Sequence, residues 1–257
     1  MIGMKLARVG IVGIAVILIL IGLGNVSGAQ MSGKMLHVWD HSLQSSYYVY
    51  RGVKSKEYPI SIQWDAYALN YTSGTQYVAI MAIVDSWGNA WGFFWKNGTV
   101  VIFSDTNDPS SDIPVYDTKI AGSSPHTYKI EVVYDSFGWI RWISKINYYI
   151  DGQLVYEESW NTPWDISYIA AGGIFDGGKT FDLFIDNVVY TYGKGNLNNG
   201  KTVSEDFEDG QDDFFTWELK GANDGKSGAE VTYSSQVPEF PFLKPLFNYL
   251  SSIIGTG

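Results

Sequence analysis

The chain has 257 residues, no cysteine and a formal net charge of −10, and aromatic residues make up 16% of it. Without cysteine it forms no disulfide, thiolate metal site or cysteine nucleophile. The acidic balance argues against nucleic acid as a partner, because phosphate binding needs a basic surface. Charged residues make up only 17% of the chain, against about a quarter in average soluble proteins, and this argues against extensive disorder.

Residues 1–29 have the pattern of a secretory signal peptide. A basic start with Lys5 and Arg8 precedes an uncharged apolar run, which ends in small residues. This order predicts a signal helix that is cleaved after Ala29. An uncleaved membrane anchor is the alternative, although the strongly apolar part, residues 9–24, is short for a membrane span. Both interpretations predict a secreted or cell-surface protein.

Short runs that favour β-strands recur after residue 30, separated by Gly, Asn, Asp, Ser and Pro. This spacing predicts an all-β, antiparallel sandwich or barrel. The strands that we expect are Met35 to Trp39, Tyr47 to Tyr50, Ile60 to Ala68, Gln76 to Asp85, Ala90 to Lys96, Thr99 to Ser104, His126 to Tyr134, Trp139 to Ile150, Gln153 to Glu158, Ile166 to Gly172 and Thr180 to Tyr192, with two more later in the chain.

The connections between these runs contain typical turn residues. Asp151-Gly152 lies between two strand-like runs, and glycine accepts the positive φ that a tight hairpin requires. The longest loop, Asp105 to Ser124, contains two Pro and four Asp, and a loop of this length is usually functional or disordered. The Gly- and Asn-rich stretch from Gly193 to Lys201 is expected to be a linker between the β-rich body, residues 30–200, and an acidic extension.

Three segments, read in order, form a further pattern: "QYVAIMAIVDSWGNAWGFFW", "HTYKIEVVYDSFGWIRWISKINYYIDGQLVYEESW" and "ISYIAAGGIFDGGKTFDLFIDNVVYTY". This pattern resembles the concanavalin A-like (laminin G-like) superfamily over roughly residues 35–192. The resemblance implies a jelly-roll sandwich of two antiparallel sheets, in which the Asp151-Gly152 turn joins neighbouring strands. Members of that superfamily bind glycans, hydrolyse them or act in adhesion, so the resemblance does not decide a function.

Glycoside hydrolysis by the usual route needs two carboxylates that face one groove, about 5 to 10 Å apart. The glucanases of the superfamily carry a Glu-x-Asp-x-x-Glu motif, which is absent from this sequence. Glu157 and Glu158 are adjacent, so they point to opposite faces of a regular strand. Asp182 and Asp186 share a face, but Asp186 belongs to the "IDNV" strand that we interpret as structural. We therefore expect a protein that is not an enzyme.

Histidine and serine give no sign of a catalytic or zinc site. His37, His41 and His126 are the three histidines, and their spacing fits no zinc motif. No nucleophile elbow of the G-x-S-x-G type is present. His126 precedes a "Tyr-x-Ile" strand, and we expect it to be a packed or hydrogen-bonded residue at the edge of that strand.

Calcium is the metal that the sequence favours, because Ca²⁺ prefers carboxylate and carbonyl oxygens from loops. The long loop offers side-chain oxygens at close spacing from Asp105, Asn107, Asp108 and Asp112. It departs from the D-x-D-x-D-G pattern, and a solvated acidic loop is the alternative interpretation. A second acidic block, residues 205–213, is typical of a solvated face, with weak Ca²⁺ binding as its alternative.

Sugar binding depends on aromatic platforms, because sugar rings present apolar faces and polar edges. Trp91 and Trp95, which share a strand face with Phe93, are among the candidate tryptophans, and core packing accounts for much of the whole set. Tryptophans predicted in loops have less structural reason to exist. The ligand-binding residues that we predict are Trp87, Trp139, Trp160 and Trp164.

The C-terminal part divides at residue 236. Residues 201–236 contain acidic β-strands, which either complete the same sandwich or pair with an exposed edge of another copy. Residues 237–257, "VPEFPFLKPLFNYLSSIIGTG", form an apolar tail whose start resembles the Pro-Glu-Phe sorting tails of archaeal exported proteins. Lys244 and Pro245 interrupt the tail, so we expect an interfacial or partner-binding segment rather than a membrane span.

Together these features predict an exported, non-catalytic module that binds carbohydrate or a cell-surface glycan. A structural surface or filament subunit that self-associates through the C-terminal strands is the first alternative. A glycoside hydrolase is the second alternative.

Overall fold

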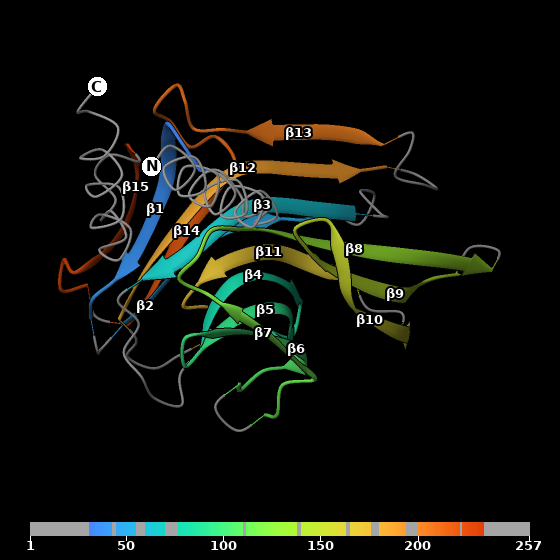
Figure 1. The fold of residues 1–257 in the computed structure, drawn as a ribbon. Coiled ribbons are helices and arrows are strands. Elements are labelled where there is room, and N and C mark those ends of the chain that lie inside the picture. Colours follow the sequence, from blue (N-terminus) through green and yellow to red (C-terminus); the bar gives the residue numbers. More distant parts are fainter. Residues whose placement is uncertain are drawn as a thin grey trace, which may run out of the picture.

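The computed structural model describes residues 31–42, 45–54, 60–69, 77–109, 112–137, 140–162, 165–175, 180–193, 200–221 and 223–233. In these residues the chain forms 15 strands in two antiparallel sheets and no helix, which confirms the predicted two-sheet sandwich (Figure 1). The described part of the chain accordingly contains no helix with the length and hydropathy of a membrane span. The predicted signal helix and the apolar tail lie outside the described residues.

One sheet has eight strands, which come from both ends of the chain and from its middle. They are β1 (Lys34–Asp40), β3 (Ile60–Leu69), β8 (His126–Phe137), β9 (Ile140–Ile150), β10 (Gln153–Thr162), β12 (Phe181–Tyr192), β13 (Lys201–Glu205) and β15 (Ser227–Tyr233). Their order is β10-β9-β8-β3-β12-β1-β15, with β13 also paired to β12.

The other sheet has seven strands. They are β2 (Ser45–Gly52), β4 (Val78–Asp85), β5 (Ala90–Lys96), β6 (Thr99–Thr106), β7 (Tyr116–Ala121), β11 (Ile166–Gly172) and β14 (Thr216–Gly221). Their order is β14-β2-β11-β4-β5-β6-β7. Figure 1 shows β4 to β7 curving beneath β3 and β12 of the eight-stranded sheet.

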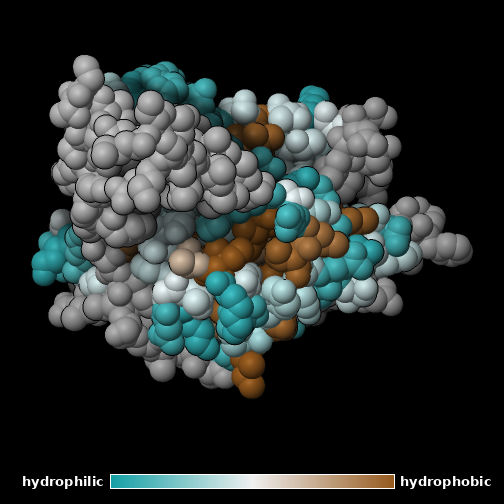
Figure 2. Space-filling model, viewed as in Figure 1, coloured by the Kyte–Doolittle hydropathy of each residue, from teal (hydrophilic) through white to brown (hydrophobic). Residues whose placement is uncertain are grey.

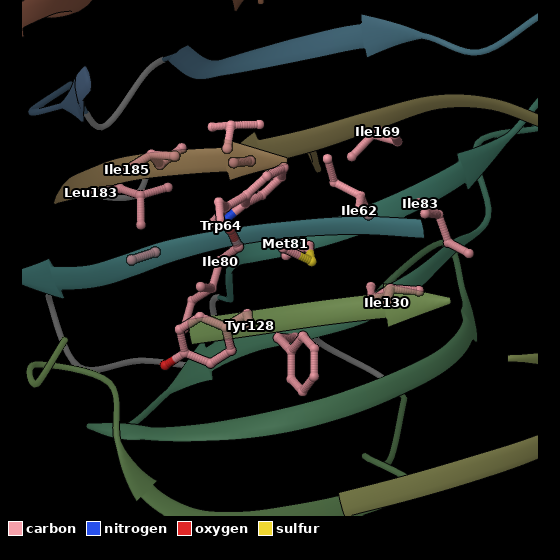
Figure 3. Packing of buried hydrophobic residues seen from close by; sticks show 14 of the residues in the cluster. Ile62, Trp64, Ile80, Met81, Ile83, Tyr128, Ile130, Ile169, Leu183 and Ile185 are labelled. Atoms are coloured by element: carbon pink, nitrogen blue, oxygen red, sulfur yellow. Dashed lines mark hydrogen bonds between the residues drawn. The ribbon is translucent and has the colours of Figure 1, made fainter. Parts of the chain in front are cut away.

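The main hydrophobic core lies between the two sheets. Figure 3 shows Trp64 and Ile62 of β3 close to Ile80 and Met81 of β4, and all four side chains are completely buried. Large aromatic side chains, including Tyr128, fill the same layer. This core is large, as a chain without disulfides requires.

Strand β12 changes its neighbour halfway along its length. Residues 181–185 pair with β1, and residues 188–192 pair with β13. Between these two halves, the pairing of β12 with β3 shifts register after Asp186, and Asn187 adopts a left-handed φ of 51°. A bulge of this kind bends a strand, and here it separates the parts of β12 that bind the two different partners.

The C-terminal strands belong to both sheets. Strand β14 pairs with β2, and β15 pairs with β1. The stretch from Gly193 to Lys201, expected to be a linker, leads from β12 into β13, which pairs with β12. It therefore connects two neighbouring strands of one sheet. Three strands follow residue 200, where the sequence analysis expected two.

Most of the expected strands are present, and two of them, Ala90–Lys96 and Ile166–Gly172, have the predicted bounds. The predicted loop from Asp105 to Ser124 was wrong in part, because Tyr116–Ala121 forms β7 at the edge of the seven-stranded sheet. Its residues are mostly exposed, so the alternation of apolar and polar residues that marks a half-buried strand is weak there.

Some large hydrophobic side chains remain exposed. On the face shown in Figure 2, hydrophobic residues gather across the centre, and hydrophilic residues border them. On edge strand β7 the ring of Tyr116 stacks on Tyr156 of edge strand β10, with centroids 5.7 Å apart. This contact joins the edges of the two sheets on that side of the sandwich.

Candidate functional site

The turn between β4 and β5 holds an exposed tryptophan in a fixed position. The carboxylate of Asp85 accepts hydrogen bonds from the backbone N–H of Trp87 at 2.8 Å and from that of Asn89 at 2.9 Å. It also accepts one from the Asn89 side-chain amide at 3.1 Å. Asp85 is only 2% exposed, whereas Trp87 is 69% exposed. The turn is therefore ordered by its own side chains and presents an indole to solvent.

Strand pairing brings this turn next to the start of the long loop. Ala90 of β5 pairs with Val84 of β4 on one side and with Thr106 of β6 on the other. Asp85 itself pairs with Ile166 of β11. The Trp87 turn, the end of β6 and the beginning of β11 consequently lie at the same end of the seven-stranded sheet.

Three carboxylates approach one another at this end of the sheet. Partial burial, followed by the negative charges of Asp85 and Asp112, raises the pKa of Asp105. Asp105 also has a left-handed φ of 53°, a conformation that aspartate tolerates better than most residues. The carboxylate of Asp112 accepts a hydrogen bond of 2.6 Å from the hydroxyl of Thr106. Negative charge is thus concentrated at the end of the sheet that carries the Trp87 turn.

Tyrosines extend this region along the outer face of the seven-stranded sheet. Tyr50 packs edge-on against Tyr168, with ring centroids 5.8 Å apart. Burial, followed by the charges of Glu218 and Asp85, raises the pKa of Tyr168. Tyr168 is therefore close enough to Asp85 to feel its charge. It lies between the Trp87 turn and Tyr50 of β2, which its ring contacts.

The centre of that outer face consists of small and aromatic residues. Ala82, Phe94 and Ala170 are completely buried in a second hydrophobic cluster. Gly92 of β5 leaves no room for a side chain, because a Cβ atom there would lie 2.1 Å from the carbonyl oxygen of Met81. The centre of the outer face is therefore apolar.

The predicted tryptophans fall into different parts of the structure. Trp87 lies in the site described above. Trp160 belongs to β10 of the other sheet, and its side chain is not described. Trp139 and Trp164 lie outside the described residues. Trp91 and Trp95 are 2% and 5% exposed, so core packing accounts for these two candidates.

The predicted calcium ligands are brought together in part. Asp105 and Asp112 interact, whereas Asn107 and Asp108 are exposed and the backbone N–H of Asp112 bonds to the carbonyl oxygen of Asp108 at 3.1 Å. Within the described ranges, no three His, Asp or Glu side chains are grouped as metal ligands. Ca²⁺ binding by this loop stays a prediction.

Sequence reasoning missed Asp85 and Tyr168. Asp85 was taken as the last residue of a strand, although the order Asp-x-Trp-x-Asn marks a side chain that caps its own turn. Tyr168 had no comparable signal, because its neighbours in space come from β2 and β4, which are distant in the sequence.

The other acidic and histidine candidates have partners within the sandwich. Glu158 accepts a hydrogen bond from Ser104, and Glu157 forms an ion pair with Lys145 at 2.9 Å. Nδ1 of His126 lies 2.8 Å from the Asp151 carboxylate, as expected for a hydrogen-bonded edge residue.

His37 and His41 approach one carboxylate on the eight-stranded sheet. Their Nε2 atoms lie 2.8 and 3.1 Å from the same oxygen of Asp182. The imidazole of His37 also stacks on the ring of Phe184, with centroids 4.5 Å apart. Through these contacts β1, and His41 directly after it, are connected to β12.

No family model matches the sequence, and no curated protein matches it. Among solved structures, a glycosidic hydrolase is similar at 14% identity, with 67% of this chain and 83% of that chain covered and a TM-score of 0.30. The β-glucanase of Bacillus licheniformis follows at 15% identity, with 63% and 71% covered and a TM-score of 0.27. An alginate lyase in complex with an alginate trisaccharide is 11% identical, with 62% and 70% covered and a TM-score of 0.22. Likeness at this level assigns the chain to no family.

Proposed function

We propose that this chain is an exported, non-catalytic module that binds carbohydrate at the Trp87 end of the seven-stranded sheet. The observation that carries the proposal is an exposed indole on a turn that Asp85 holds with three hydrogen bonds. These hydrogen bonds order the backbone of the turn. An exposed indole on an ordered loop can stack on the apolar face of a sugar ring. The neighbouring carboxylates supply acceptors for hydroxyl groups.

The charge of the site selects the class of sugar. Asp105 and Asp112 lie at the same end of the sheet as the Trp87 turn, and the whole chain carries a net charge of −10. A uronic acid or a sulfated sugar would bring further negative charge to these carboxylates, which is unfavourable. A neutral hexose stacks its apolar face on the indole and donates its hydroxyls to carboxylates. The ligand class is therefore a neutral polysaccharide.

The test is calorimetric titration of the protein with soluble oligosaccharides from neutral and from acidic polysaccharides, preceded by a glycan array. Trp87→Ala should weaken binding of the neutral ligand about tenfold or more, because a stacked indole loses its buried apolar area. Trp217→Ala is the matched control, since Trp217 is 64% exposed but lies on β14. Equal binding by Trp87→Ala and wild type would overturn the assignment of the site.

Hydrolysis is a second candidate, and the raised pKa of Asp105 favours it. A carboxyl with a raised pKa near another carboxylate is a feature that glycosidase sites share. However, Asp85 is occupied by the hydrogen bonds of its own turn, and Asp112 by that of Thr106. Release of reducing sugar from a neutral polysaccharide, abolished by Asp105→Asn with binding retained, would replace the binding module by an enzyme.

A further inference from the structure

Strand β14 is a regular edge of the seven-stranded sheet. It pairs with β2 over six consecutive residue pairs without a register shift, and among the described strands it has no neighbour on its other side. The opposite edge, β7, is irregular, because its pairing with β6 shifts register and Lys119 has a left-handed φ of 62°. Bulges of that kind protect an edge against pairing with another strand. Strand β14 has no register shift, and its one positive φ, 99°, belongs to its last residue, Gly221.

The side chains of β14 alternate between the two faces of the sheet. Glu218 and Lys220 lie on the outer face around Tyr48, whose hydroxyl donates a 2.6 Å hydrogen bond to Glu218 and whose ring lies 5.4 Å from the Lys220 ammonium. On the inner side Leu219 packs against the main core, and Trp217 stacks on Tyr47 at 6.0 Å. Trp217 nevertheless remains 64% exposed.

We propose that β14 pairs antiparallel with β14 of a second copy, around a two-fold axis through Leu219. Residues that face each other across an antiparallel pair point to the same side of the sheet, so the axis passes through a residue and not between two. Centred on Leu219, the pair places Glu218 opposite Lys220 of the partner, and Lys220 opposite the partner's Glu218. Both pairs lie on the outer face.

The neighbouring register is unfavourable. Centred on Glu218, the pair would place two glutamates directly opposite each other, and like charges in that position destabilise a sheet. In the Leu219 register the exposed Trp217 faces Gly221 of the partner subunit, which has no side chain, and an aromatic ring opposite an edge glycine covers its exposed backbone. Of these two registers, the one centred on Leu219 makes β14 complementary to itself.

A second copy of this chain fits the edge better than an unrelated strand, because the symmetric pairing satisfies both charges of β14 at once. The interface is small beside the roughly 1,600 Å² of a standard complex, so the dimer is weak and forms at high local concentration. The Trp87 turn follows β4, three strands away from β14. Pairing at β14 therefore leaves both carbohydrate sites open.

The test is a charge exchange in the full chain, followed by sedimentation over a range of concentrations. Lys220→Glu should weaken the dimer at least tenfold, because each glutamate then faces another, and Glu218→Lys should do the same. An equimolar mixture of these two variants should form a heterodimer as strong as the wild-type dimer. Lys119→Glu on β7 is the control and should leave association unchanged. Apolar segments elsewhere are identical in all these chains, so they do not contribute to the differences.

A wild-type protein that stays monomeric at about millimolar concentration overturns the proposal, and so does a dimer that Lys220→Glu does not weaken. Cysteine cross-linking then tests the register, because the chain has no native cysteine. Leu219→Cys should form an intermolecular disulfide rapidly under mild oxidation, since the two Cα atoms face each other about 5 Å apart. Thr216→Cys should react slowly. Equal rates at the two positions would exclude this register.

Discussion

The indole Nε1 of Trp64 donates a hydrogen bond to the backbone carbonyl oxygen of Ile80 in the opposite sheet, with an N–O distance of 3.2 Å. Trp64 is completely buried, so it packs the core and also ties the two sheets together. Trp64→Phe removes the donor and leaves space, and we expect a loss of about 2 to 3 kcal/mol in the free energy of unfolding. Urea unfolding followed by circular dichroism measures it. Trp217→Phe, at an exposed indole, should change the same quantity by less than about 0.5 kcal/mol.

The carboxyl of Asp186 predicts a pH-dependent stability. Burial, opposed by the N–H of Asn187 and reinforced by the charge of Asp65, raises its pKa from 3.8 to about 6. The folded chain then holds this proton more tightly than the unfolded chain between about pH 4 and pH 6. Its contribution to stability is complete below that window and is lost as the pH rises through the folded pKa. Because these two values differ by about 2, the loss is at most about 3 kcal/mol.

Asp186→Asn tests this effect, since the amide oxygen still accepts from the N–H of Asn187 but carries no charge. In calcium-free buffer the variant should be more stable than wild type at pH 8 and similar to it at pH 4. Unfolding by urea at both pH values gives the comparison. A difference between variant and wild type that does not change with pH would contradict the assigned pKa.

Substitution of glycine by alanine should reduce the free energy of unfolding by different amounts at Gly92 and at Gly98. A Cβ atom at Gly92 would lie 2.1 Å from the Met81 carbonyl oxygen, so the backbone of β4 or β5 has to move. Gly98 has open space around its Cβ direction, and only its φ of 86° opposes a side chain. We expect Gly98→Ala to cost about 1 kcal/mol and Gly92→Ala about 2 to 3 kcal/mol. Thermal melting of both variants decides the order.

Asp151 anchors the hairpin between β9 and β10. Its carboxylate accepts a hydrogen bond from the backbone N–H of Thr127 at 3.0 Å and contacts His126, and its φ is 51°. Asp151→Ala removes both contacts and places an unsuitable residue in a left-handed conformation, with an expected loss of about 2 kcal/mol. Asp151→Asn keeps an acceptor and tolerates this φ, so it should lose less than half as much. Similar losses in chemical denaturation would show that the carboxylate interactions are not the cause.

Sequence patterns predicted local structure well because local rules determine it. Asn97-Gly98 and Asp151-Gly152 adopt the positive φ values that their residue types favour. Strand β7 was missed because it is exposed at an edge and has a weak apolar pattern. The order of strands was not predictable from periodicity, since β1 pairs with β12 and β15, which lie at the far end of the chain.

Site residues could be predicted from the sequence only where the residues of their own loop indicate their role. Trp87 and Asp105 were identified because they occur in loops rich in turn and acidic residues. Partial burial raises the pKa of Asp105, however, and the charge of Asp85, which comes from another strand, raises it further. Tyr50 and Tyr168 meet through the pairing of β2 with β11. Contacts that depend on pairing between distant strands cannot be predicted from the residues next to them in the sequence.

The late position of β14 and β15 in the chain has a consequence for biosynthesis. Strands β1 and β2, which are made first, find their partners β15 and β14 only when residues 216–233 have left the ribosome. Until then β1 and β2 each lack one partner, and an unpaired strand edge can pair with another chain. Pairing between such distant segments also makes folding slow. A chain that is truncated before β14 would have β1 and β2, in place of β15 and β14, as edge strands of the two sheets.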